Sequence, residues 1–250
     1  MPAFEATPGM PYWQDLVTAQ PKKAAYFYSK LFGWDVSTDA YRVARKDGLP
    51  VGGIVGADAG APGWTPYFLS PGGDIVERVA SLGGTVVSSA EVSLGTMTLC
   101  QDPSGCLFGL IRPRGEDQFV AAGEPGVPVW HEYVASSTEA IDFYAELFNW
   151  EVSRDGNYFI ALQDGAPFLG MLLEPDAGVA LWQIFFGVAN LEESLTTVNN
   201  FGGTVVGGPE ASPFGLIAVA EDAAGAGLLL CEVDAPVFED VAESDSILDL

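Results

Sequence analysis

The feature that most constrains the fold of this chain is an internal duplication, which is easiest to follow through its tryptophans. The chain has 250 residues and six Trp. Every Trp has a counterpart 116 to 118 residues away, in the pairs Trp13 and Trp130, Trp34 and Trp150, and Trp64 and Trp182. Because repeats of this length are large enough to form complete units, the sequence predicts two similar domains in tandem.

Other segments keep nearly the same offset. The recurring markers are Phe27-Tyr28 with Phe143-Tyr144, GGTVV at 83–87 with the same letters at 202–206, and a turn at Asp102 with one at Asp222. The two repeats therefore span residues 8–113 and 127–234. The segment RPRGEDQFVAAGEPGV between them has the charge, Gly and Pro content of an exposed linker. Residues 235–250 form an acidic tail.

Each half contains a weaker repeat of its own, because Trp13 and Trp64 lie 51 residues apart and Trp130 and Trp182 lie 52 apart. Each of the four quarters opens with a short apolar or alternating run, which is typical of a strand. An amphipathic segment of helical period follows, and then short segments suited to a β-meander. The pattern β-α-β-β-β, repeated four times, predicts an α+β fold in which each half forms one sheet of about eight strands with helices on one face.

Composition narrows the classes of partner. With 10 Lys and Arg against 34 Asp and Glu, the formal net charge is −24, and such a field repels phosphates. This argues against nucleic acid and anionic membrane surfaces as partners, and no apolar run approaches the roughly 20 residues that span a bilayer. Three Cys are too few for a disulfide scaffold, and the N-terminus lacks a signal-peptide pattern, so we expect a cytoplasmic protein with reduced thiols.

The helix ends FYSKLFGW and FYAELFNW, the strand starts GGTVV and the hairpin DPSGCLFGLI occur in order along the four modules. In these motifs the chain resembles the vicinal oxygen chelate superfamily of glyoxalases, bleomycin resistance proteins and extradiol dioxygenases, and most of all its two-domain bacterial members. The resemblance covers residues 8–234. It implies two glyoxalase-like domains, each an eight-stranded, cup-shaped sheet with its helices on the outer face. It implies little about activity, because one fold hosts many chemistries.

In metal-dependent members of this superfamily, a divalent ion is held in the cup by His or Gln from the opening strands and by Glu from later strands. Carried onto this sequence, the opening-strand position falls on Trp13 in the first half and on Val129 or Trp130 in the second. An indole has no lone pair to offer a metal. The usual Glu position falls on Gly109 and on Leu229.

Metal ligands can therefore be sought only in the second half, from His131, Glu174 and Gln183. His131 is the only histidine in the chain. It would face the cup only if its strand shifted by one residue, which would turn every side chain of that strand to the other face. We therefore expect His131 to lie on the helix-packed face or at the rim, and we expect no bound metal or other cofactor.

The strand register implied by the resemblance gives each cup one flat aromatic side chain and one carboxylate. If Trp13 and Trp130 face the cups, side-chain alternation places Asp15 and Glu132 on the same faces. An indole can stack on a planar or cationic ligand, while a carboxylate pairs with a cation or accepts hydrogen bonds. The expected ligand-binding residues are Trp13, Asp15, Tyr67, Trp130, Glu132, Phe185 and Gln183. The alternative is that the Trp side chains fill the cups as core and that the carboxylates cap backbone amides.

These observations favour a metal-free member of the superfamily that binds or sequesters a small organic molecule in one or both cups. Two alternatives stay open: a metal-dependent lyase, isomerase or dioxygenase that uses the second half, and an interaction module whose acidic surface and tail engage a basic partner. No catalytic residue can be assigned. Because one chain holds two complete module pairs, we expect a monomer able to fold alone, and a homodimer is compatible with this.

Overall fold

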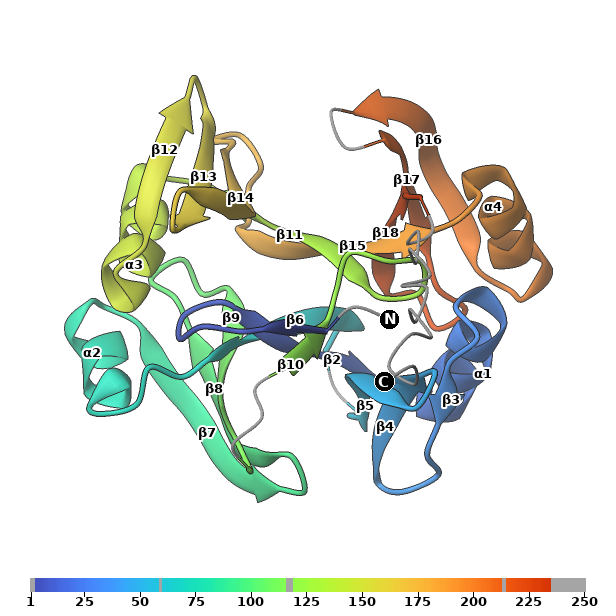
Figure 1. The fold of residues 1–250 in the computed structure, drawn as a ribbon, viewed down its shortest axis with the longest axis horizontal. Helices are drawn as coiled ribbons and strands as arrows, with labels where there is room; N and C mark the ends of the chain where they lie inside the picture. The colour runs from blue at the N-terminus through green and yellow to red at the C-terminus, as the bar shows by residue number, and fades with distance from the viewer. Residues whose placement is uncertain (1–2, 59, 116–118, 213–214, 235–250) are drawn as a thin grey trace, which may run out of the picture.

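A computed structural model, which describes residues 3–58, 60–115, 119–212 and 215–234, shows two eight-stranded sheets with the same strand order (Figure 1). The first sheet runs from edge to edge as β3 (Asp35–Val36), β4 (Tyr41–Lys46), β5 (Leu49–Gly56), β2 (Pro11–Thr18), β6 (Gly63–Leu69), β9 (Leu107–Pro113), β8 (Gly95–Gln101) and β7 (Thr85–Val92). The second runs as β12 (Glu151–Asp155), β13 (Tyr158–Gln163), β14 (Ala166–Leu173), β11 (Pro128–Ala135), β15 (Leu181–Val188), β18 (Gly227–Glu232), β17 (Gly215–Glu221) and β16 (Thr204–Ser212). The predicted α+β fold of two glyoxalase-like domains is confirmed.

Each quarter of the chain follows the predicted order β-α-β-β-β. The helices are α1 (Pro21–Leu31), α2 (Ile75–Ser81), α3 (Thr138–Phe148) and α4 (Leu191–Asn200). The opening strands of the two modules in each half, β2 with β6 and β11 with β15, pair antiparallel in the middle of their sheet. Each eight-stranded sheet is thus complete within one chain. A small two-stranded sheet joins β1 (Ala3–Glu5) to β10 (Phe119–Ala121).

The helices begin and end largely as the sequence indicates. Pro21 stands at the start of α1, where its missing N–H is not needed. The side chain of Asn190 caps α4 by accepting a hydrogen bond from the backbone N–H of Glu193 at 2.9 Å. Asp74 and Ser137 precede α2 and α3, but their side chains make no capping bond. Of these three residues that precede a helix, only Asn190 caps its helix through its side chain.

The two sheets lie back to back. Figure 1 shows β11 and β15 next to β2 and β6, while the outer strands of each sheet curve away, so that the concave faces open in opposite directions. Helix α1 contacts α4, and α2 contacts α3. The helices therefore lie on the outer face of their cups, as predicted, and this outer face is enclosed between the domains.

Residues from both halves build each of the two main apolar cores. One core joins Phe27 and Tyr28 of α1 to Phe186 of β15. The other joins Phe68 and Phe108 of the first half to aromatic side chains of α3 and β15. Because burial of such side chains is the main source of folding free energy, we expect the two domains to unfold together.

The second Trp pair of the duplication crosses the domain interface. The indole Nε1 of Trp34 donates to the carbonyl of Gly126 at 2.7 Å, and that of Trp150 donates to the carbonyl of Gly9 at 3.0 Å. Each acceptor precedes the opening strand of the other half. The recurrence of these Trp in the sequence therefore reflects one structural role, carried out twice.

The turn at Asp102 also joins the two halves. Asp102 is only 3% exposed. Its Oδ2 accepts hydrogen bonds from the hydroxyls of Tyr133 (2.5 Å) and Tyr144 (3.1 Å) in the second half. Its Oδ1 accepts bonds from the backbone N–H groups of Ser104 and Cys106 in its own turn. The sequence identifies a turn here but not a buried carboxylate that links the domains.

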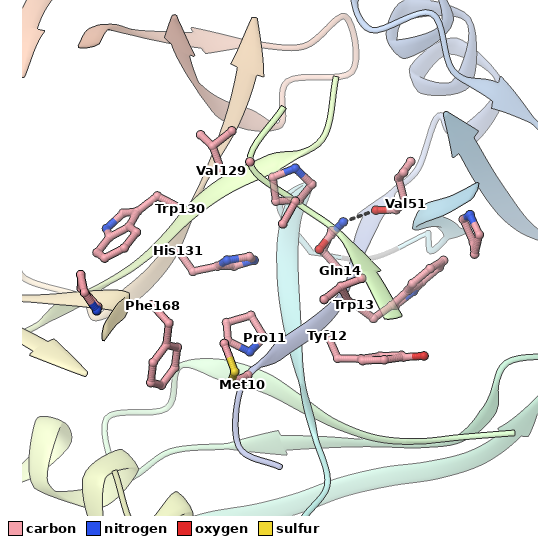
Figure 2. A pocket seen from close by; sticks show the side chains of 16 residues that line it. Met10, Pro11, Tyr12, Trp13, Gln14, Val51, Val129, Trp130, His131 and Phe168 are labelled. Atoms are coloured by element: carbon pink, nitrogen blue, oxygen red, sulfur yellow. Dashed lines mark hydrogen bonds between the residues drawn. The ribbon is translucent and has the colours of Figure 1, made fainter. Parts of the chain in front are cut away.

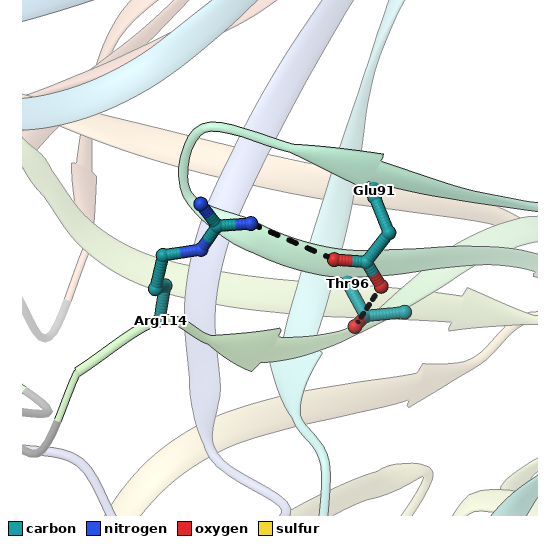
Figure 3. Close-up of polar contacts among 3 residues, drawn as sticks. All are labelled: Glu91, Thr96 and Arg114. Carbon is teal, nitrogen blue, oxygen red and sulfur yellow. Dashed lines mark hydrogen bonds and ion pairs between the residues drawn. The ribbon is translucent and has the colours of Figure 1, made fainter.

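Ion pairing contributes little to this framework. Within the described ranges, the single ion pair joins Arg114 to Glu91 at 3.8 Å, and Thr96 donates to the same carboxylate (Figure 3). Both charged side chains are mostly exposed, and exposed pairs contribute only about 0 to 1 kcal/mol. No helix in the described part of the chain is long and apolar enough to cross a membrane.

Candidate functional site

Equivalent residues of the two halves occupy the concave faces of the sheets. Residues directly opposite each other on paired strands point to the same side. The register places Trp13 opposite Tyr67, Asp15 opposite Thr65, Trp130 opposite Phe185, and Glu132 opposite Gln183. In both opening strands a β-bulge precedes the Trp.

The first cup is filled by its own side chains. Trp13 is 4% exposed and packs against Tyr67. Val43, Met97 and Ile111 complete a cluster that is separate from the two cores between the domains. Trp13 is therefore part of a small core of its own on the concave face.

The carboxylate of the first cup, that of Asp15, is buried and accepts hydrogen bonds from neighbouring side chains. Oδ1 of Asp15 accepts hydrogen bonds from Nε1 of Trp13 (2.9 Å) and from the hydroxyl of Tyr41 (2.7 Å). Burial raises the pKa of Asp15, and the bonds from Tyr41, Trp13 and Tyr67 partly oppose that rise. Gly53 on the neighbouring strand leaves room for this group, because a Cβ there would overlap both the carboxylate and the Tyr41 hydroxyl.

The second cup is open. It contains a cavity of about 740 Å³, within the range typical of sites for small molecules. Its lining is mainly apolar and aromatic, and consists of Gly123, Val129, Trp130, Glu132, Tyr158, Ile160, Phe185, Ser212, Ile217, Cys231 and Val233. Trp130, Glu132 and Phe185 are half-buried, whereas their counterparts in the first cup are buried.

A carboxylate and a phenol form the polar part of this cavity. The hydroxyl of Tyr158 donates to Oε2 of Glu132 at 2.8 Å, and Nε1 of Trp130 lies 3.3 Å from the same hydroxyl and donates to it. Burial raises the pKa of Glu132, and the bond from Tyr158 opposes the rise. Gly170 repeats the role of Gly53, because a Cβ there would overlap the Tyr158 hydroxyl.

One pair of equivalent positions explains much of the difference between the cups. In the first cup the ring of Tyr67 lies directly over Gly109, where any Cβ would overlap the ring. The equivalent of Gly109 is Leu229, which stands opposite Phe185. Because the side chain of Leu229 takes up that space, Phe185 cannot lie against the sheet as Tyr67 does.

No protein-family model matches the chain. The chain is 27% identical to "Putative glyoxylase CFP32" of Mycobacterium bovis, over 87% of this chain and 92% of that relative. It is also 27% identical to the anthracycline biosynthesis protein DnrV of Streptomyces peucetius, over 90% of this chain and 94% of that relative. Among solved structures, the Mn(II)-bound glyoxalase of Novosphingobium aromaticivorans matches with a TM-score of 0.66 and 13% identity, over 93% of this chain and 86% of that one. The 2,3-dioxygenase LapB of Pseudomonas sp. KL28 matches with a TM-score of 0.62 and 15% identity, over 95% and 96%.

The chain has the vicinal oxygen chelate fold. The resemblance inferred from the sequence is thereby confirmed.

The candidate metal ligands named from the sequence do not come together in either cup. His131 is 8% exposed and lies between the domains, on the face of β11 opposite the cup. Glu174 is exposed just beyond β14. Gln183 lies opposite Glu132 in the register, and it lines a separate cavity of about 790 Å³ with residues of both halves. In the part of the chain that the structure describes, no three His, Cys, Asp or Glu side chains come together as a metal site.

Of the seven expected binding residues, three line the open cavity, and three others, Trp13, Asp15 and Tyr67, are buried in the first cup. Trp130, Glu132 and Phe185 share the open cavity, and Gln183 is not among the residues that line it. Tyr158 is not among the residues predicted from the sequence. A signal was available, because Tyr41 and Tyr158 keep the same 117-residue offset as the cup Trp pair and so occupy equivalent places.

Proposed function

We propose that the second cup binds a small planar organic molecule, and that this binding does not use a resident metal. The observation that carries the proposal is the contrast between the duplicated cups: the first is filled by buried side chains, while the second keeps a cavity of about 740 Å³ with the half-buried carboxylate of Glu132 at its wall. An unfilled apolar cavity lowers stability, so its retention beside a filled twin favours a binding role.

The lining indicates the kind of ligand. Trp130 and Phe185 offer aromatic faces on which a planar ring can stack. Glu132 keeps acceptor capacity beyond the bond from Tyr158, and therefore suits a hydroxyl, an amine N–H or a cation on the ligand. The name of the relative DnrV, an anthracycline biosynthesis protein, is compatible with an aromatic ligand.

The two alternatives from the sequence have less support. A metal-dependent lyase, isomerase or dioxygenase would need ligands that converge, and His131, Glu174 and Gln183 lie apart. The proposed interaction through the acidic tail concerns residues 235–250, which lie outside the described residues.

Titration calorimetry with two planar probes tests the proposal: 2-naphthol, which is neutral at pH 7, and 9-aminoacridine, which is cationic. We expect at least one probe to bind, and we expect Trp130→Ala to weaken it about tenfold or more through the lost stacking surface. Tyr158→Phe should weaken a ligand that uses Glu132. Its matched control, Tyr41→Phe in the filled cup, should leave the affinity unchanged.

The opposite pattern would refute cup binding. If both probes failed to bind, or bound equally well to wild-type protein and to Trp130→Ala, the open cup would not be a site for planar molecules.

A further inference from the structure

A cavity distinct from the open cup and from the cavity lined by Gln183 lies between the domains, where the opening strands β2 and β11 begin (Figure 2). Its volume is about 290 Å³. Apolar side chains make up most of its wall, among them Pro11, Tyr12, Val129 and Phe168. An apolar cavity of about 150 Å³ is large enough to bind benzene, so this one has room for a substituted aromatic ring.

His131 lines this cavity and holds an unpaired polar atom just beneath its wall. Its imidazole points from β11 into the space between the strands (Figure 2). The Nε2 atom is fully buried and has no hydrogen-bond partner. The duplication provides a comparison, because the equivalent residue is Gln14, whose Nε2 donates to the carbonyl of Val51. The same position is thus satisfied in one half and open in the other.

An unpaired buried polar atom costs free energy unless something bonds to it. Burial lowers the pKa of His131 to about 4, so the imidazole is neutral at pH 7. A neutral imidazole nitrogen either donates or accepts one hydrogen bond, depending on the tautomer, and a hydroxyl group can complement either form. No Asp, Glu, Lys or Arg is among the residues that line the cavity, which disfavours an ionic ligand.

We propose that this interdomain cavity is a second ligand site, and that it takes a small uncharged aromatic molecule with one hydroxyl group. The hydroxyl bonds to Nε2 of His131, and the ring packs between Phe168 and the residues of β2. This site is separate from the open cup and does not depend on binding there. The two sites are adjacent, because Gly123, Val129 and Trp130 line both cavities.

The experiment uses the full chain and phenol as the probe. Since His131 is the only histidine, a long-range ¹H–¹⁵N correlation spectrum of protein labelled at histidine shows a single imidazole without assignment. We expect phenol to shift the Nε2 resonance in a saturable way, and toluene, which has the ring but no hydroxyl, to bind without a comparable Nε2 shift. His131→Leu should weaken phenol about tenfold, the usual contribution of one hydrogen bond, and should not weaken toluene.

Two further variants separate this site from the cup. Glu132→Gln should leave the phenol-induced shift unchanged, whereas Phe168→Trp, which narrows the cavity, should reduce it. The proposal would be overturned by a Nε2 resonance that does not respond to phenol at saturating concentration, as expected if only water occupies the cavity. It would also be overturned by a shift that Glu132→Gln abolishes. The first result comes from the wild-type protein, so it does not depend on the variants folding.

Discussion

The duplicated cups allow one substitution to be compared at two equivalent positions. Trp13→Ala removes a ring that is 4% exposed, packed in the first cup and bonded to Asp15. Replacing a buried Trp by Ala costs about 3 to 5 kcal/mol, and the lost bond to a buried carboxylate adds about 1 kcal/mol. Trp130→Ala removes a half-buried ring that already borders a cavity. The loss there is about 1 to 2 kcal/mol, since less surface returns to water.

Urea unfolding followed by far-UV circular dichroism measures both variants against the wild type. We expect Trp13→Ala to lower the free energy of unfolding by at least about 2 kcal/mol more than Trp130→Ala does. Trp13→Phe and Trp130→Phe serve as controls, because each keeps an aromatic ring. Equal losses at the two positions would refute the contrast between a filled and an open cup, and with it the basis of the proposed function.

Three further predictions follow from buried polar groups. Burial holds the pKa of His131 at about 4 while the unfolded chain keeps the ordinary value of 6.5, so lowering the pH from 7 to 4 protonates this group in the unfolded state first. The contribution of His131 to stability should therefore fall by about 3 kcal/mol, measured as the difference between wild-type protein and His131→Phe in parallel urea titrations. Gly170→Ala should displace the Tyr158 hydroxyl and weaken 2-naphthol binding measured by calorimetry; unchanged affinity would contradict the role of that hydroxyl. Asp102→Ala leaves the hydroxyl of Tyr133 without its buried acceptor and should lower the free energy of unfolding by about 2 to 3 kcal/mol; a loss within 0.5 kcal/mol would show that this link between the domains is dispensable.

The fold could be predicted because its signals are local and repeated. Trp13 and Trp130 mark equivalent strands, and period-two alternation places Asp15 and Glu132 on the same face of each sheet as the Trp. The β-bulge before each Trp has no clear signature in the sequence. The predicted face of the Trp and carboxylate side chains does not depend on this bulge, because the bulge comes before the Trp in each strand and the strand register after it is regular.

Which cup is open could not be predicted, because that outcome depends on how volumes add in three dimensions. The exchange of Gly109 for Leu229 is visible when the repeats are aligned. Its effect follows only from the geometry, in which Tyr67 lies over Gly109. A pattern of apolar and polar residues records which side chains share a face, not whether they fill the space between them.

The environments of Asp102 and His131 could not be predicted from the sequence for a different reason. Both depend on the back-to-back packing of the two domains, which brings Tyr133 and Tyr144 to Asp102 and encloses His131 beside β2. Alternation correctly indicates that His131 faces away from the cup. It gives no information on whether that face meets a helix, solvent or a second sheet.

The two carboxylates connect this packing to function. Burial raises the pKa of both Asp15 and Glu132, so each position costs free energy when charged unless hydrogen bonds compensate. In the first cup Asp15 receives bonds from both Trp13 and Tyr41, and these bonds partly offset the cost within the protein. In the second cup the indole of Trp130 donates to the hydroxyl of Tyr158, and that hydroxyl donates to Glu132. A donor on a planar ligand would supply to Glu132 what Trp13 supplies to Asp15, and this is the physical reason to expect the second cup to bind a ligand that carries a hydrogen-bond donor.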